Sequence, residues 1–188
     1  ILHLACRGLL RVSLFQAIIL GVLQGITEFF PISSSGHLKL AQALFGFENL
    51  STYITFDLTC HGGTLLALFF VFRKTLCTLL TSHKKLSLLL FLALLPLGIL
   101  YPFLSMVRAV YNEPHFLGGF FLITSLLLFL EDKVPHHTVT SQPRWYDALV
   151  IGFFQVCAIF PGISRSGSTI AAARYMGWSR HDAARFSF

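Results

Sequence analysis

The chain has 188 residues, of which 55% are hydrophobic and only 12% are charged. This balance excludes an ordinary soluble domain and indicates a membrane protein. The formal net charge of +6 does not indicate nucleic-acid binding, because the basic residues lie in short loops at the ends of apolar runs, where they orient a chain in a bilayer.

The apolar segments differ in length, and length separates full spans from shorter elements. About 20 apolar residues cross the hydrocarbon core, whereas runs of about 10–14 are more often re-entrant or buried. Residues 14–46 and 147–178 each contain an apolar helix that breaks at a Pro and a Ser-rich turn and then resumes, so each is predicted to form a re-entrant hairpin. Three transmembrane spans are predicted within residues 53–130, at 53–72, 86–104 and 116–130.

The two hairpins carry one motif twice. GVLQGITEFFPISSSGH at 21–37 and GFFQVCAIFPGISRSGS at 152–168 align at a single offset of 131 residues. A pair of broken helices in matching positions of a hydrophobic chain indicates a buried polar site. The coinciding pairs are Gly21/Gly152, Gln24/Gln155, Phe29/Phe160, Ile32/Ile163, Ser33/Ser164, Ser35/Ser166 and Gly36/Gly167.

The basic loop at residues 73–85 sets the predicted orientation, because such loops stay in the cytoplasm. Three spans, an odd number, separate the hairpins, so the first dips in from outside and the second from the cytoplasm. The chain is therefore predicted to be one all-α polytopic membrane domain, residues 1–188, built from inverted repeats. Residues 181–188 are expected to begin a further span, since the second repeat is truncated here.

The first turn brings ionisable groups into an apolar segment. Gln24 and Glu28 are four residues apart and share a helix face, and a carboxylate at membrane depth indicates a functional site. His37 follows the turn, and imidazole suits proton transfer near neutral pH. A turn that opens a helix offers free N–H groups and the positive end of the helix dipole to an anion. This turn consists of Ser33, Ser34, Ser35 and Gly36.

The second turn repeats this design and adds a cation. It consists of Ser164, Arg165, Ser166, Gly167, Ser168 and Thr169. The planar guanidinium of Arg165 matches phosphate oxygens. Two anion-binding turns that face each other, with Glu28, His37 and Arg165 between them, would suit a phosphorylated substrate.

Structural interpretations of the same residues stay open. Each turn alone could be a helix break in which serine only caps, and Arg165 could pair with Glu28 only to neutralise both charges. His61, four residues after Asp57, could line the same cavity or only pack against a neighbouring helix. Repetition of both turns in register, with complementary charges, favours the functional interpretation.

The two turns resemble the signatures of the bacterial undecaprenyl-pyrophosphate phosphatase family, also known for bacitracin resistance. The first signature, an acidic or Gln residue, three residues, Glu and then a Pro–x–Ser–Ser–(Ser/Thr)–Gly–His turn, runs from Gln24 to His37. The second, Pro–Gly–x–Ser–Arg–Ser–Gly–(Ala/Ser)–Thr, runs from Pro161 to Thr169 without a gap. The resemblance extends along the chain, which corresponds to about the first two thirds of a member. Many members carry Glu where this chain has Gln24, which weakens any mechanism with two carboxylates.

The resemblance implies a multi-pass protein of the bacterial inner membrane, with two inverted repeats and an active site open to the outer face. It implies hydrolysis of undecaprenyl diphosphate to undecaprenyl phosphate, which recycles the lipid carrier for peptidoglycan synthesis and gives bacitracin resistance. The implied partners are an isoprenoid diphosphate lipid and the bilayer, with a homodimer as an open alternative. A divalent cation, Mg²⁺ or Ca²⁺, could bridge the diphosphate and Glu28, and no organic cofactor is indicated.

By the same resemblance, Ser34 is the candidate nucleophile, with His37 as its base and Glu28 orienting His37. An alternative keeps Ser34 as a phosphate ligand and lets His37 attack or activate water. Arg165 and the N–H groups of both turns would hold phosphate oxygens and stabilise the charge in transfer. The other candidate phosphate-binding residues are Gln24, Ser33, Ser35, Gly36, Ser164, Ser166, Gly167 and Thr169.

Two other functions fit parts of the pattern. An inverted-repeat transporter or flippase for a phosphorylated lipid would also use broken helices, but a carboxylate, an imidazole and a guanidinium together exceed what transport needs. A membrane acid phosphatase of the vanadate-haloperoxidase-like superfamily needs a second His where Ala171 stands and an upstream Lys–Arg motif that the sequence lacks, so this function is rejected.

Overall fold

The computed structural model describes residues 12–47, 53–110, 114–134 and 143–188, and in these ranges the secondary structure is entirely helical. This confirms the predicted all-helical class. In chain order the elements are α2 (Leu14–Thr27), α3 (Ser34–Leu44), α4 (Ile54–Ser82), α5 (Lys84–Val110), the 3₁₀ turn η2 (Pro114–Phe116), α6 (Leu117–Asp132), α7 (Trp145–Cys157), α8 (Arg165–Tyr175) and α9 (Arg180–Ser187).

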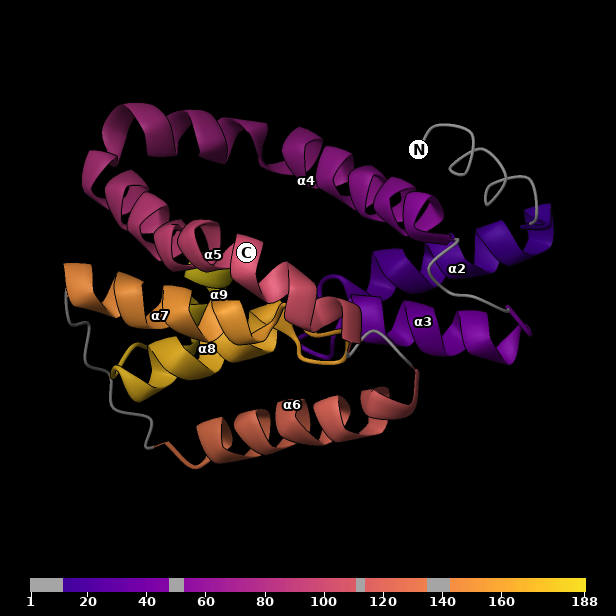
Figure 1. The fold of residues 1–188 in the computed structure, drawn as a ribbon. Helices are drawn as coiled ribbons and strands as arrows, with labels where there is room; N and C mark the ends of the chain where they lie inside the picture. The colour runs from indigo at the N-terminus through magenta and orange to yellow at the C-terminus, as the bar shows by residue number, and fades with distance from the viewer. Residues whose placement is uncertain (1–11, 48–52, 111–113, 135–142) are drawn as a thin grey trace.

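The internal repeat of the sequence is also a repeat of secondary structure. Helices α2 and α3 form one helix–turn–helix pair, and α7 and α8 form another (Figure 1). At the 131-residue offset of the motif, α2 and α7 begin together, and α3 and α8 begin and end together. The entry of these pairs into a membrane and their inversion remain predictions.

Local sequence sets the ends of these helices. Ser13 and Gln16 form a capping box at the start of α2, in which the Ser13 hydroxyl accepts the Gln16 N–H at 3.2 Å and the Gln16 side chain accepts the Ser13 N–H at 3.0 Å. Pro31 and Pro161 follow the ends of α2 and α7. Proline has no N–H and cannot continue a helix, so neither α2 nor α7 extends into the serine turn that follows it.

Helices α4 and α5 are the long apolar elements. Ile54–Ser82 and Lys84–Phe103, with mean hydropathies of 1.6 and 2.2, are long and apolar enough to cross a membrane. The prediction of a loop at residues 73–85 is wrong, because α4 continues to Ser82 and only His83 separates it from α5. Lys and Arg are good helix formers, and neither Gly nor Pro stands between residues 73 and 85. Helix α6 has 16 residues, fewer than the usual span, so its membrane crossing remains a prediction.

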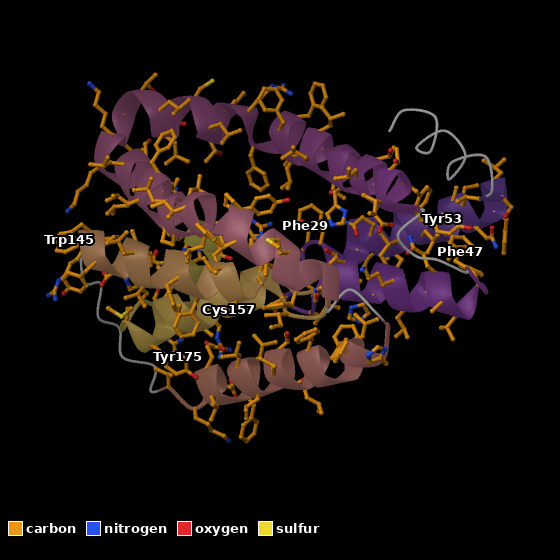
Figure 2. All side chains as sticks on the ribbon, in the orientation of Figure 1. Phe29, Phe47, Tyr53, Trp145, Cys157 and Tyr175 are labelled. Carbon is orange, nitrogen blue, oxygen red and sulfur yellow. The ribbon has the colours of Figure 1, made fainter. Side chains whose placement is uncertain are left out.

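Helices α5, α6 and α9 pack around the second pair. Helix α5 lies along α7 so closely that a methyl group on Gly152 would lie 2.3 Å from the Ala93 carbonyl oxygen. Small buried clusters form the core, one around Ile151 and Trp178 and another around Leu20 and Leu38. Many large apolar side chains instead point outward, above all from α4 (Figure 2). Such an extensive apolar surface is typical of a lipid-facing protein.

A buried arginine fixes α6 against α8. Arg174 is 2% exposed, and its Nε donates to Glu131 Oε1 at 2.9 Å while Nη1 donates to the Trp178 carbonyl at 2.9 Å. A buried guanidinium is tolerated when its N–H groups are paired in this way. The position of α6 matters for the site, because this helix also holds the second turn.

Candidate functional site

The two serine turns meet in space. The Gly162 N–H donates to Ser33 Oγ at 3.1 Å, although 129 residues separate them in sequence. A methyl group on Gly36 would lie 2.9 Å from Gly162 Cα, and one on Gly167 would lie 3.0 Å from the Pro31 carbonyl oxygen. Figure 1 shows the turn of α2 and α3 directed toward that of α7 and α8. Glycine at these crossings lets the two backbones approach.

Helix α6 holds the second turn in place. Thr124 Oγ1 donates to the Gly162 carbonyl at 2.8 Å and accepts the Ser164 N–H at 3.0 Å. The rings of Phe120 and Phe160 stack beside it, with centroids 5.3 Å apart. Gly162 itself has φ +102°, a left-handed conformation that glycine adopts without a steric penalty.

Glu28 is the centre of the polar cluster. It caps α2, and its Oε2 accepts the Gln24 amide at 2.8 Å and the Ser34 hydroxyl at 2.6 Å. Its Oε1 lies 3.6 Å from Arg165 Nη2. The structure thus brings three predicted catalytic residues together around one carboxylate that is 17% exposed, while the Arg165 side chain is half exposed.

His37 lies beside this cluster, and its described contacts are with other groups. Its Nδ1 is 2.9 Å from the Ser33 carbonyl oxygen, and its ring meets the edge of Phe121 with centroids 5.0 Å apart. The hydrogen bonds of the described residues do not join His37 to Ser34 or Glu28. The predicted role of His37 as the base of Ser34 therefore remains a prediction.

A second imidazole stands closer to the carboxylate. His61 Nε2, from α4, is 4.0 Å from Glu28 Oε2, and His61 Nδ1 is 2.8 Å from the Asp57 carbonyl oxygen. His61 was not among the predicted site residues, and its place in the same cavity was one of two open alternatives. The signal that could have added it was an ionisable side chain within a predicted span, which is functional by default.

The two turns expose their helix starts differently. Ser33 has φ 68°, and its side chain does not cap α3. The first N–H groups of α3, at Ser34, Ser35 and Gly36, therefore have no side-chain cap, and they point where an anion would be stabilised. Ser35 is partly exposed beside them.

In the second turn, the predicted phosphate-binding hydroxyls are buried and engaged. Ser164 Oγ accepts the Gly167 N–H at 3.1 Å and lies 3.3 Å from Ser166 Oγ. Thr169 Oγ1 donates to the Arg165 carbonyl at 3.0 Å and lies 2.5 Å from Ser187 Oγ of α9. These contacts favour a structural role over direct phosphate binding for Ser164, Ser166, Gly167 and Thr169.

The predicted divalent cation has little support in this donor set. No group of three His, Cys, Asp or Glu side chains in the described residues could hold a metal. Glu28 has a guanidinium beside one oxygen and two donors on the other, although the buried Gln24 Oε1 has no hydrogen-bond partner in the part of the chain that the structure describes. The residues present do not form a cation site by themselves, and the cation remains a prediction.

Comparison with known proteins gives the family. The model of the family described as bacitracin resistance protein BacA matches residues 17–188. A protein of Protochlamydia amoebophila named undecaprenyl-diphosphatase is 42% identical over 94% of this chain and 68% of its own length. Proteins of the same name from Thermodesulfovibrio yellowstonii and Alkaliphilus metalliredigens are 36% and 38% identical, over 94% and 93% of this chain and 68% and 70% of their own lengths. These matches confirm the resemblance carried by the two turns, and the chain belongs to the bacitracin resistance protein BacA family.

Proposed function

We propose that the chain is a membrane phosphatase that hydrolyses undecaprenyl diphosphate to undecaprenyl phosphate and inorganic phosphate. Membership of a family whose named relatives are undecaprenyl-diphosphatases makes it a phosphatase. One observation carries the mechanism: the Ser34 hydroxyl donates to Glu28 Oε2 at 2.6 Å, beside the half-exposed Arg165. A nucleophile, a base and a cation are thus in contact.

In the proposed first step, Ser34 Oγ attacks the terminal phosphorus of the diphosphate. Glu28 Oε2 accepts the hydroxyl proton along the existing hydrogen bond, and the bridging P–O bond breaks to release the lipid monophosphate. Glu28 rather than His37 serves as base, because Glu28 is already within hydrogen-bond reach of Ser34. The Gln24 amide holds the other side of that oxygen at 2.8 Å and keeps the carboxylate oriented.

The charge of the diphosphate is matched by two features of the site. Arg165 contributes a guanidinium whose side chain is 50% exposed, and the uncapped start of α3 contributes N–H groups around Ser34 and Ser35. Phosphoryl transfer depends mainly on such positioning and charge stabilisation. His37 is partly exposed at the same turn, and with Nδ1 on the Ser33 carbonyl oxygen it would donate to a phosphate oxygen only in its doubly protonated form.

The substrate and the apolar surface give the proposed setting. The isoprenoid tail would stay in the lipid beside the outward-facing apolar side chains, while the diphosphate enters the polar cluster from the outer face of the bacterial inner membrane. The reaction would recycle the carrier for peptidoglycan synthesis and give bacitracin resistance. A homodimer remains a prediction that no contact tests.

A phosphate-release assay on undecaprenyl diphosphate in detergent tests this function. Wild-type protein should release phosphate, and Ser34→Ala should lose both release and any burst of lipid monophosphate. Arg73→Ala is the control, because Arg73 is exposed and its hydrogen bond within the described residues goes to a carbonyl of its own helix. Unchanged burst kinetics in Ser34→Ala would remove Ser34 as nucleophile. Loss of release in a chelator, restored by Mg²⁺ or Ca²⁺, is the expected result for the predicted cation.

A further inference from the structure

Hydrolysis of a phosphoserine needs a base for the attacking water, and the structure offers one that the proposed first step leaves unused. After Glu28 has taken the Ser34 proton, it is neutral and cannot activate water. The phosphoserine must nevertheless be hydrolysed. If Glu28 keeps that proton for Ser34 Oγ, the group that accepts a proton from water is a different residue near Ser34.

His61 meets this requirement by its geometry. Its Nδ1 is 2.8 Å from the Asp57 carbonyl oxygen, an acceptor, so Nδ1 carries the hydrogen of the neutral ring and Nε2 is left as the basic nitrogen. Nε2 points at the site, 4.0 Å from the Glu28 oxygen that also accepts the Ser34 hydroxyl. That separation is too long for a direct hydrogen bond and suits a water molecule between the two atoms.

We propose that His61 is the general base that activates water for hydrolysis of phosphorylated Ser34. This inference rests on the proposed function and assigns its second step. Water oxygen attacks the phosphorus, and the Ser34 Oγ–P bond breaks. One water proton passes to His61 Nε2, the other stays on the released phosphate, and the proton held by Glu28 returns to Ser34 Oγ.

The surroundings of His61 support this division of labour. The His61 side chain is 38% exposed and that of Glu28 is 17% exposed, so His61 is the better placed of the two to return its proton to solvent. Asp57, which supplies the fixed carbonyl, is itself held by the Gln42 amide at 2.5 Å. The ring is therefore anchored through α4 to α3, the helix that Ser34 begins.

Rapid-quench kinetics with substrate labelled in its terminal phosphate test the assignment. His61→Gln should still release about one equivalent of lipid monophosphate per enzyme, retain label on the protein, and turn over about 10²–10⁴-fold more slowly. Equal slowing of both steps, no label on the protein, or a steady-state rate within twofold of wild type would overturn it. No hydrolysis by wild type would instead refute the proposed function.

A second variant separates catalysis from support of the fold. His61→Asn keeps an amide donor where Nδ1 stands, so it preserves the bond to the Asp57 carbonyl and removes the basic nitrogen. If His61 is only structural, the Asn variant should behave like wild type; if it is the base, both variants should accumulate phosphoenzyme. His83→Gln, at the opposite end of α4, is the control and should leave every step unchanged.

Discussion

The two serine turns both join a pair of helices, but their first serines make different hydrogen bonds. Ser33 and Ser164 both precede the second helix of their pair. Ser33 is left-handed at φ 68°, and its hydroxyl oxygen accepts the Gly162 N–H of the other turn. Ser164 is extended and caps its own helix at the Gly167 N–H. The start of α3 therefore has no side-chain cap, whereas Ser164 caps the start of α8.

Equivalent positions in the two turns show where the repeats diverged. Ser34 and Arg165 each begin the second helix of their pair, and both side chains face Glu28. The position equivalent to Glu28 holds Ile159, which is buried. The position equivalent to His37 holds Ser168, whose buried hydroxyl has no hydrogen-bond partner among the described residues. The two pairs of helices are therefore alike in backbone and different in charge. The carboxylate of Glu28 contacts a residue of each turn, Ser34 and Arg165.

The sharpest way to test this asymmetry is to change Glu28 and its equivalent. Glu28→Gln should lower the rate of phosphate release about 10²–10⁴-fold, because the Ser34 proton loses its acceptor. Ile159→Val should keep activity within a few-fold and cost about 0.5–1.5 kcal/mol of stability through a lost buried methyl group. Rates come from phosphate release and stability from thermal unfolding in detergent. A tenfold or smaller loss in Glu28→Gln would exclude Glu28 as the base.

The charge contributed by the second turn should matter somewhat less. Arg165→Ala should lower kcat/KM about 10²–10³-fold, since it removes one stabilising group for charge on the phosphoryl oxygens. Its melting temperature should hardly change, because the guanidinium is half exposed and 3.6 Å from Glu28. Arg73→Ala should match wild type in both measurements. A wild-type rate for folded Arg165→Ala would show that Arg165 only neutralises Glu28.

The sequence allowed the repeat and the helix class to be predicted, because both depend on local signals. Proline breaks, serine turns and long apolar runs are read residue by residue, and they place α2 with α7 and α3 with α8 at the correct offset. The helix that contains the first predicted span continues beyond residue 72. Charge alone suggested a loop there, while Arg and Lys also favour helix, so α4 runs on to Ser82.

The identity of the histidine nearest Glu28 could not be predicted in the same way. His37 is close to Glu28 in sequence, but the direction of its ring depends on the left-handed Ser33, and Ser33 is fixed by its contact with Gly162. His61 reaches Glu28 only because α4 packs beside α2. Both arrangements depend on contacts between segments that are distant in sequence, so the spacing of residues within one segment does not predict them.

Two glycine substitutions test the backbone conformation and packing of the second turn. Gly162→Ala should destabilise the fold by about 3 kcal/mol, the sum of a left-handed alanine and a tight contact. Its φ is +102°, and the added methyl group would lie 2.7 Å from Phe120 Cβ. Gly21→Ala, in the middle of α2 with nothing within 4 Å, should instead stabilise by up to about 1 kcal/mol. Equal melting temperatures for the two variants would mean that α6 does not pack against the second turn as described.

Ser164 distinguishes a capping turn from a phosphate-binding turn, and the expected effect is the smallest of the four. Ser164→Ala removes the acceptor of the Gly167 N–H, which should cost about 1 kcal/mol of stability. Activity at a temperature where the variant is folded should stay within about threefold of wild type, because the hydroxyl is 1% exposed and faces its own helix rather than Glu28. Ser164→Thr keeps the cap and is the matched control. If Ser164→Ala instead lost activity more than tenfold at unchanged stability, its hydroxyl would belong with the phosphate ligands after all, and the second turn would share the open helix start of the first.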